Sequence, residues 1–288
     1  MNSENTLSEQ GGTLYIVATP IGNLDDMSPR AAAILSRVAV IAAEDTRHSG
    51  RLLQHLGISK PMMALHEHNE RDKAGQVLEK LAAGQDVALI SDAGTPLISD
   101  PGFVLVREAR ARGYRVSPVP GACALISALS AAGLPTDRFL FEGFLPARQG
   151  ARKTALERLA RESATLVFYE SPHRIVDTVR DIEQVMGAER ELVLARELTK
   201  TFETFYAGHA AGVRENIEAD PHGSRGEFVV MVHGASAEEL SASSAEVDRV
   251  LVLLLAELPV KKAAKLAAEL TGRSKNELYQ RALELKAE

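Results

Sequence analysis

The fold class of this chain is decided by the stretch Ile90-Ser91-Asp92-Ala93-Gly94-Thr95-Pro96-Leu97-Ile98-Ser99-Asp100-Pro101-Gly102. It follows the short apolar run 86–90, which is typical of a buried strand. Asp100-Pro101 then predicts the start of a helix, as N-cap and first helical residue. A strand, a loop with a carboxylate and a glycine, and a helix in this order indicate an open α/β sheet, in which ligands bind at the carboxyl ends of the strands. We therefore expect a small molecule to bind at this loop.

Strands and helices alternate on both sides of this loop. In the first half of the chain the pattern predicts strands at 13–19, 39–43, 62–65, 86–90 and 115–119. In the second half it predicts strands at 139–142, 165–170, 191–195, 203–206 and 227–233, and Ser171-Pro172 is expected to cap a helix. This rhythm predicts an α/β fold with two α/β domains, each with a largely parallel or mixed sheet covered by helices.

The rest of the chain adds a smaller helical part. Residues 1–12 are polar and predicted to be disordered, 13–121 form the N-terminal α/β domain and 122–234 the second. A stretch rich in Ser, Ala and Glu predicts a linker at 235–245. Beyond it, 246–288 have a purely helical pattern, in which Pro259 opens a helix, Gly272 ends it and Ser274 begins the next. Two short helices around a glycine turn indicate a helix-turn-helix-like tail.

Composition limits the possible functions. The chain has 288 residues, 45% of them hydrophobic and 25% charged, which is ordinary for a globular protein. A net charge of −6 argues against a surface that grips nucleic acid as a whole, although local patches still can. The single cysteine, Cys123, excludes an internal disulfide and a multi-cysteine zinc site. The polar N-terminus and the absence of a long apolar run predict a cytosolic location.

Several known ligand motifs are missing. The loop 20–24 has one glycine where a dinucleotide fingerprint needs three, and there is no Walker A sequence. His66 and His68 are spaced to share a strand face, but the ligand set is incomplete, so we expect no metal site.

Charged groups gather at other predicted strand ends. Glu44-Asp45-Thr46-Arg47 offers two carboxylates and a guanidinium that could orient a hydroxyl or remove its proton. The stretches 168–174 and 196–200 combine acids with cations in the same way, and Arg174 could contact a phosphate. The alternative for each is a capped helix with solvated charges.

Two basic stretches interrupt the acidic average. Each of 148–161 and 261–275 holds five basic residues against one acidic residue. Either could contact phosphates, and a solvated helix face remains the alternative. Trp is absent and aromatic residues are only 5%, which argues against a platform that stacks single-stranded bases.

A set of motifs in a fixed order points to a family. They are Thr19-Pro20-Ile21-Gly22-Asn23-Leu24, Glu44-Asp45-Thr46-Arg47, Ser91-Asp92-Ala93-Gly94-Thr95-Pro96, Pro120-Gly121-Ala122, Phe168-Tyr169-Glu170-Ser171-Pro172-His173-Arg174 and Gly226-Glu227-Phe228. Together they resemble the tetrapyrrole methylase (class III S-adenosylmethionine-dependent methyltransferase) family. Within it they resemble the branch that methylates cytidine 2′-hydroxyls of bacterial 16S rRNA. The resemblance covers roughly residues 12–288.

The resemblance implies two α/β domains with S-adenosylmethionine in the cleft between them, and a homodimer. It carries cofactor contacts onto this chain at Asp92, Ala93, Gly94, Thr95, Cys123, Ala124 and Tyr169. It places Pro20, Gly22 and Asn23 near the methyl acceptor. Tetrapyrrole-acting relatives carry Gly-Asp-Pro where this chain has Ser91-Asp92-Ala93, and this departure supports the RNA branch.

The expected reaction is methyl transfer to a cytidine ribose 2′-hydroxyl in 16S rRNA of the small ribosomal subunit. Candidates for the general base are Glu44, Asp45 and Glu170, and candidates for orienting the substrate are Arg47, His173, Arg174 and Lys200. Two alternatives remain open, namely C-methylation of a tetrapyrrole precursor and a non-catalytic RNA-binding role in assembly.

Overall fold

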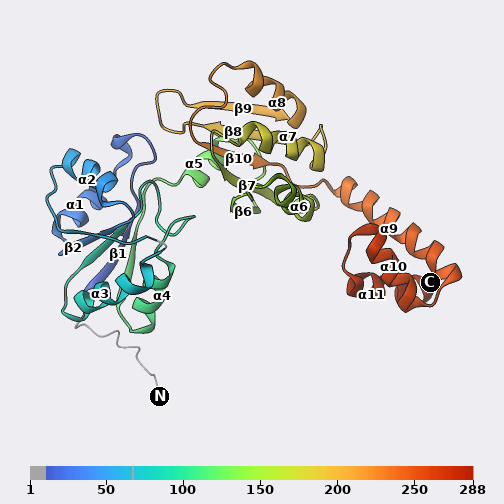
Figure 1. Ribbon diagram of the computed structural model, residues 1–288, viewed down its shortest axis with the longest axis horizontal. Helices are drawn as coiled ribbons and strands as arrows, with labels where there is room; N and C mark the ends of the chain where they lie inside the picture. Colours follow the sequence, from blue (N-terminus) through green and yellow to red (C-terminus); the bar gives the residue numbers. More distant parts are fainter. Residues whose placement is uncertain (1–10, 67, 288) are drawn as a thin grey trace. The chain divides into compact units, whose positions relative to one another are not determined.

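The computed structural model describes residues 11–66 and 68–287, and the chain divides into two compact units (Figure 1). The first comprises Met1–Glu157 and Thr165–His233, and the second comprises Arg158–Ala164 and Gly234–Glu288. Disorder is predicted for residues 1–12. Residues 1–10 of this segment lie outside the described residues. No described helix is long and apolar enough to cross a membrane.

The first sheet is entirely parallel, in the order β3-β2-β4-β1-β5. Its strands are β1 (Thr13–Val17), β2 (Val40–Ala43), β3 (Met62–Ala64), β4 (Val87–Ile90) and β5 (Arg115–Val119). Every residue of β2 and β4 is buried, as expected for central strands covered on both faces. The loops after β1, β2 and β4 therefore leave the sheet at one common edge, which is where the predicted ligand loop lies.

Helices cover both faces of this sheet. One core packs α1 (Pro29–Arg37) and α2 (Thr46–His55) on β1, β2 and β4, and the other packs α3 (Glu70–Ala82) and α4 (Phe103–Ala111) on the opposite face. A short 3-10 helix, η1 (Leu24–Asp26), follows β1. The layers are those of a doubly wound α/β domain, as the alternation predicts.

The predicted start of α4 at Asp100-Pro101 is wrong. The helix begins at Phe103, after Gly102 with φ 129°. Its first free N–H groups, those of Val104 and Leu105, donate to the carboxylate Oε1 of Glu70 at 2.7 and 3.1 Å. Because a side chain from α3 caps the helix, Asp100 is not needed as a cap.

The second sheet is mixed, in the order β6-β7-β10-β8-β9. Its strands are β6 (Phe139–Phe144), β7 (Thr165–Glu170), β8 (Glu191–Arg196), β9 (Thr204–His209) and β10 (Phe228–Val232). Only β6 and β7 pair in parallel, and the other neighbours are antiparallel. One face packs on α5 (Ala124–Ala131), and the remaining helices are α6 (Gln149–Leu159), α7 (Ile175–Met186) and α8 (Ala210–Ala219).

Ser171-Pro172 does not cap α7, contrary to the prediction. The helix begins four residues after Ser171, at Ile175, and Arg174 is its N-cap. The Ser171 backbone N–H and hydroxyl both donate to Glu170 Oε1, at 2.8 and 3.4 Å, so its side chain is engaged with the preceding strand end. A turn closed by Ser171 O precedes the helix instead.

In the part of the second unit that the structure describes, residues 234–287 form the helices α9 (Ala237–Glu257), α10 (Val260–Thr271) and α11 (Lys275–Ala287). Leu251, Ala264, Ala267 and Leu278 are central to its core. The predicted linker at 235–245 is wrong, because α9 already begins at Ala237. Ser236 and Glu239 form a capping box there, which provides partners for N–H groups of the first turn. Gly272, with φ 68°, ends α10 as predicted.

Candidate functional site

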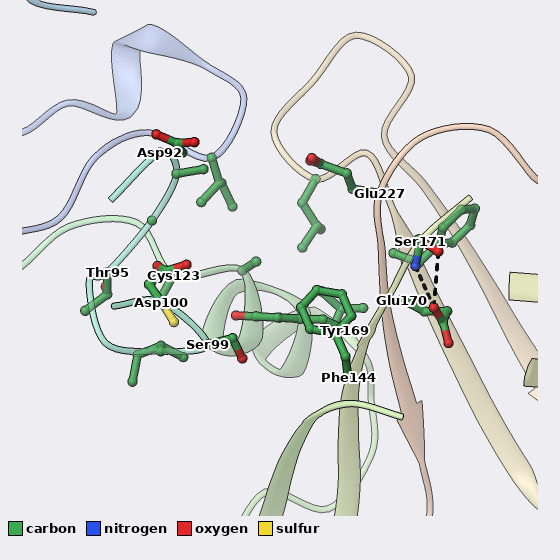
Figure 2. Close-up of a pocket in the computed structure, with 18 of the residues that line it drawn as sticks. Asp92, Thr95, Ser99, Asp100, Cys123, Phe144, Tyr169, Glu170, Ser171 and Glu227 are labelled. Atoms are coloured by element: carbon green, nitrogen blue, oxygen red, sulfur yellow. Dashed lines mark hydrogen bonds between the residues drawn. The ribbon is translucent and has the colours of Figure 1, made fainter. Parts of the chain in front are cut away.

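A cavity of about 430 Å³ in the first unit is lined by segments of both sheets (Figure 2). Its size is typical of small-molecule sites. The loops after β1, β2 and β4 and the start of α5 form one wall, and the ends of β6, β7, β8 and β10 form the other. The lining residues are Ile21, Glu44, Asp92, Ala93, Gly94, Thr95, Ile98, Ser99, Asp100, Cys123, Ala124, Phe144, Tyr169, Glu170, Ser171, Pro172, Ala195, Leu198, Glu227, Phe228 and Val229.

The loop after β4 is held in place by hydrogen bonds to the loop after β1 and to the segment before α5. Thr19 and Gly94 exchange two backbone hydrogen bonds of 2.9 and 3.1 Å, and Thr95 Oγ1 donates to Ala122 O at 3.0 Å. Leu97 and Ser99 adopt φ values of 73° and 66°, which are costly for residues with a side chain. Such strain persists where the surrounding structure imposes it, commonly at ligand sites.

Carboxylates gather on this wall. The Asp92 backbone N–H donates to Glu44 Oε2 at 3.4 Å, and Asp92 Oδ1 accepts the backbone N–H of Asp45 at 3.1 Å. Burial raises the pKa of Glu44. Burial, aided by the charges of Glu44 and Asp92, raises the pKa of Asp100 to about 6 despite a hydrogen bond from Ser91. In Figure 2, Asp92 and Asp100 lie on the same side of the cavity as Thr95 and Cys123.

The opposite wall is aromatic at its centre. The Tyr169 hydroxyl accepts the backbone N–H of Leu125 at 3.2 Å, and its ring packs edge-on against Phe141 and Phe144, with centroids 4.9 and 5.8 Å away. Burial raises the pKa of Tyr169 to about 12, so the phenol stays neutral at physiological pH. Tyr169 therefore supplies a flat apolar surface and a fixed hydroxyl.

Glu170 borders the cavity but is fully engaged in hydrogen bonds. It is 3% exposed. Its Oε1 accepts the Ser171 N–H, and its Oε2 accepts from Arg174 Nη2 at 3.0 Å and from Thr178 Oγ1 at 2.8 Å. Arg174 also donates to Leu145 O at 2.6 Å. Glu170 and Arg174, both predicted to act on the substrate, thus stabilise the start of α7.

Other predicted residues lie outside the cavity lining. Asp45 caps α2 and pairs with Arg47 at 2.8 Å, and hydrogen bonds from Arg47 hold the pKa of Asp45 well below its usual range. Asn23 caps η1. Lys200 Nζ donates to Glu197 Oε1 at 2.9 Å and to Glu227 Oε2 at 2.8 Å. The remaining predicted residues absent from the lining are Pro20, Gly22, His173 and Arg174.

The structure brings together nine predicted residues, namely Glu44, Asp92, Ala93, Gly94, Thr95, Cys123, Ala124, Tyr169 and Glu170. The main acid that the sequence reasoning missed is Asp100. It lies in the decisive stretch 90–102, but was interpreted as a helix cap. Glu227 was also missed, although it belongs to the motif Gly226-Glu227-Phe228.

The histidines His66 and His68 form an edge-on ring pair with centroids 6.1 Å apart. His66 Nε2 lies 3.1 Å from Asn69 Nδ2. Within residues 11–66 and 68–287, no group of three or more His, Cys, Asp or Glu side chains could hold a metal ion.

Comparison with known protein families gives two matches. Residues 13–213 match the family described as Tetrapyrrole (Corrin/Porphyrin) Methylases. Residues 241–286 match the one described as RsmI C-terminal HTH domain. Together these matches span both units of the chain.

Relatives that match over almost their whole length point to the same family. The chain is 60% identical to the ribosomal RNA small subunit methyltransferase I of Pseudomonas aeruginosa, over 95% of this chain and 97% of that one. It is 53% identical to the protein of the same name from Escherichia coli O157:H7, over 99% of each chain.

Among solved structures, the methyltransferase CobJ superposes with a TM-score of 0.58 at 21% identity, over 78% of this chain and 95% of that one. At that identity the likeness concerns the fold. The motifs, the cavity at the strand ends and the match to residues 13–213 lead to one conclusion. The chain belongs to the tetrapyrrole (corrin/porphyrin) methylase family.

Proposed function

We propose that this chain transfers the methyl group of S-adenosylmethionine to the 2′-hydroxyl of a cytidine in 16S rRNA of the small ribosomal subunit. The observation that carries the proposal is the 60% identity, over almost the whole of both chains, to a ribosomal RNA small subunit methyltransferase I. The helical unit supports the same conclusion, because it matches the C-terminal domain description of such enzymes.

The lining of the cavity suits S-adenosylmethionine by its charge and by its apolar side chains. The cofactor carries a sulfonium and an ammonium, and the wall formed by Glu44, Asp92 and Asp100 is acidic. Apolar side chains such as Ile98 and Phe144 suit an adenine ring. The residues proposed to hold the cofactor are Asp92, Ala93, Gly94, Thr95, Cys123, Ala124 and Tyr169. When bound, it supplies an electrophilic methyl group.

The chain's own residues position and deprotonate the acceptor hydroxyl. Of the three predicted bases, Glu44 fits best, because it lines the cavity and burial raises its pKa above the ordinary value. Asp45 is a weak base beside Arg47, and both oxygens of Glu170 already accept hydrogen bonds. We assign proton removal to Glu44 and a positioning role to Glu170. Holding the acceptor oxygen against the methyl carbon can lower the activation free energy by about 7–11 kcal/mol.

Substitution of Glu44 tests this assignment. Glu44→Gln should lower the single-turnover rate on rRNA by about 10²–10⁴-fold, a larger loss than the fall in S-adenosylmethionine affinity measured by calorimetry. Asp45→Asn is the matched variant on the neighbouring residue, and its rate should fall much less. Equal rates for Glu44→Gln and the parent would remove Glu44 as the base.

The activity itself is tested with methyl-labelled S-adenosylmethionine. Small ribosomal subunits, naked 16S rRNA and uroporphyrinogen are offered separately to the full-length protein. Label in alkali-resistant dinucleotides is expected, because a methylated 2′-oxygen cannot attack the adjacent phosphate. Label in the tetrapyrrole alone would favour C-methylation. Cofactor binding without transfer to any substrate would favour a non-catalytic assembly role.

Contacts to the rRNA backbone are proposed for the second basic stretch. Lys261, Lys262 and Lys265 are exposed at the start of α10. The first stretch is less suitable, because Arg152 is 3% exposed and forms a 2.7 Å ion pair with Asp181. Replacing the three lysines by alanine should lower the slope of log affinity against log salt by about 0.7–0.9 per lost phosphate contact.

A homodimer in the cytoplasm is part of the proposal. The large apolar side chains of Phe103, Ile126 and Phe139 are exposed in the first unit, which supports burial against a second copy. Light scattering coupled to size exclusion should give twice the mass of the chain, and a monomer at micromolar concentration would contradict this.

A further inference from the structure

A second groove, of about 550 Å³, adjoins the cavity. It is lined by Pro172, His173, Val176, Asp177, Ser224, Arg225 and Gly226. Pro172 belongs to both linings, and Gly226 is followed directly by Glu227 of the first cavity. A chain-like substrate with one residue in the cavity therefore places its neighbouring group at this groove.

The groove offers exposed hydrogen-bond donors, and one of them is the guanidinium of Arg225. Arg225, His173 and Ser224 are exposed, and in the part of the chain that the structure describes neither Arg225 nor His173 has an acidic partner. Nearby arginines are different. Arg174 pairs with Glu170, and Arg196 lies 3.7 Å from Asp220.

The one acid in the groove lining is already paired. Asp177 Oδ1 accepts from Arg180 Nη1 at 3.1 Å. Arg180 lies on the same helix and also pairs with Glu218, so it offsets part of the Asp177 charge, and Arg225 gives the groove its positive character.

The backbone that carries Arg225 is fixed. Arg225 O accepts from Arg196 Nε at 2.8 Å, and Arg225 N donates to His222 O at 2.9 Å. Gly226 has φ 88°, and a Cβ there would lie 2.4 Å from Glu197 Cγ. The turn is therefore specified by glycine and by a buried arginine, which limits the conformational entropy lost when Arg225 binds a ligand.

We propose that this groove binds a backbone phosphate of the RNA strand, next to the nucleotide whose ribose is methylated. The inference rests on the proposed function, since it concerns the same substrate. A guanidinium binds a phosphodiester with two parallel hydrogen bonds, and the His173 imidazole and Ser224 hydroxyl can add one each. Phosphate contacts of this kind fix the register of a nucleic acid. The groove thus selects which ribose enters the cavity.

The test compares Arg225→Ala with Arg112→Ala, which removes an exposed arginine from the C-terminal end of α4. With small subunits as substrate, Arg225→Ala should raise KM for the RNA about tenfold or more. It should leave the affinity for S-adenosylmethionine unchanged and reduce the salt slope of RNA binding by about 0.7–0.9. Arg225→Lys should recover part of the affinity, because it keeps the charge but loses the bidentate geometry.

Mapping of the methylated nucleotide gives a second readout. Arg225→Ala, alone and combined with His173→Gln, should spread label to riboses beside the normal one. Unchanged KM, salt slope and position of methylation in the double variant would overturn the inference, as would a loss confined to cofactor affinity. Failure of the parent protein to methylate rRNA would instead contradict the proposed function, so the two failures are distinguishable.

Discussion

The acidic residues on the two walls of the cavity differ in whether they form ion pairs. On the first wall, Glu44, Asp92 and Asp100 accept hydrogen bonds from backbone N–H groups or a hydroxyl, and no ion pair joins them to a described cation. On the second wall, Glu170 is paired with Arg174, and Glu227 with Lys200. Carboxylates without a cationic partner attract cationic ligands, whereas paired carboxylates hold segments in place. The first wall is therefore suited to chemistry and the second to support.

The largest effect is expected from breaking the support. Glu170→Ala removes the acceptor of Thr178 and one of two acceptors of Arg174, at a side chain that is 3% exposed. Loss of one partner of a fully buried pair costs about 3–5 kcal/mol. Because the Arg174 side chain is 25% exposed, the free energy of unfolding should fall by about 3 kcal/mol, the lower end of that range, in urea titrations.

Two variants sharpen this result. Glu170→Gln keeps an acceptor oxygen and should lose less stability than Glu170→Ala. Glu218→Ala removes a partially exposed carboxylate that pairs with Arg180 and Arg214, and should cost about 1 kcal/mol or less. Equal losses for Glu170→Ala and Glu218→Ala would contradict the comparison.

On the first wall the same kind of change should affect binding. Asp92→Ala removes an acidic group beside the proposed cofactor and the acceptor of the Asp45 N–H. Hydrogen bonds to charged groups contribute about 1.5–3 kcal/mol, so S-adenosylmethionine affinity should fall roughly 10–150-fold in calorimetry. Asp92→Asn keeps an acceptor for the Asp45 N–H, so its loss of affinity measures the contribution of the charge alone. If Asp92→Ala binds the cofactor like the parent, this wall is not the cofactor wall.

Much of the fold follows from the sequence because local rules decide it. Ser28-Pro29 begins α1 and Gly272 ends α10, as capping preferences predict. The errors occur where distant residues intervene. Glu70 caps α4 from another helix, and Ser171 bonds to Glu170, so the caps expected from neighbouring residues are wrong.

In the site, too, features set by adjacent residues could be predicted and features set by distant residues could not. The loop after β4 could be located because the strand end, glycine and carboxylate are adjacent in sequence. The roles of its acids could not, because they depend on which cations come near in space. Asp45 and Glu44 are consecutive, yet Asp45 is paired with Arg47 and Glu44 is half-buried in the cavity lining.

A smaller effect concerns the contact between the loop after β1 and Lys200. A Cβ on Gly22 would lie 2.4 Å from Lys200 Cγ. Gly22→Ala should therefore destabilise the protein by about 1–3 kcal/mol, as overpacking does. Shortening the opposing side chain in Gly22→Ala/Lys200→Ala should return part of that loss. Gly150→Ala is the matched control, since its Cβ would meet nothing within 4 Å. If Gly22→Ala/Lys200→Ala loses as much stability as Gly22→Ala alone, the contact with Lys200 is not the cause of the loss.

A pH dependence of stability is expected at Asp100. Burial raises the pKa of this carboxyl in the folded protein to about 6, above its ordinary value of 3.8. Between these values the folded state holds a proton that the unfolded state has lost, so the contribution of Asp100 to stability falls as the pH rises from about 4 to 6. Asp100→Asn removes this loss. The variant should therefore be more stable than the parent above pH 6, by a margin that shrinks on acidification toward pH 4. Urea titrations of both proteins across this range measure the difference. A margin independent of pH would mean that Asp100 is ionised like an exposed aspartate, and the first wall would lose one of its titrating groups.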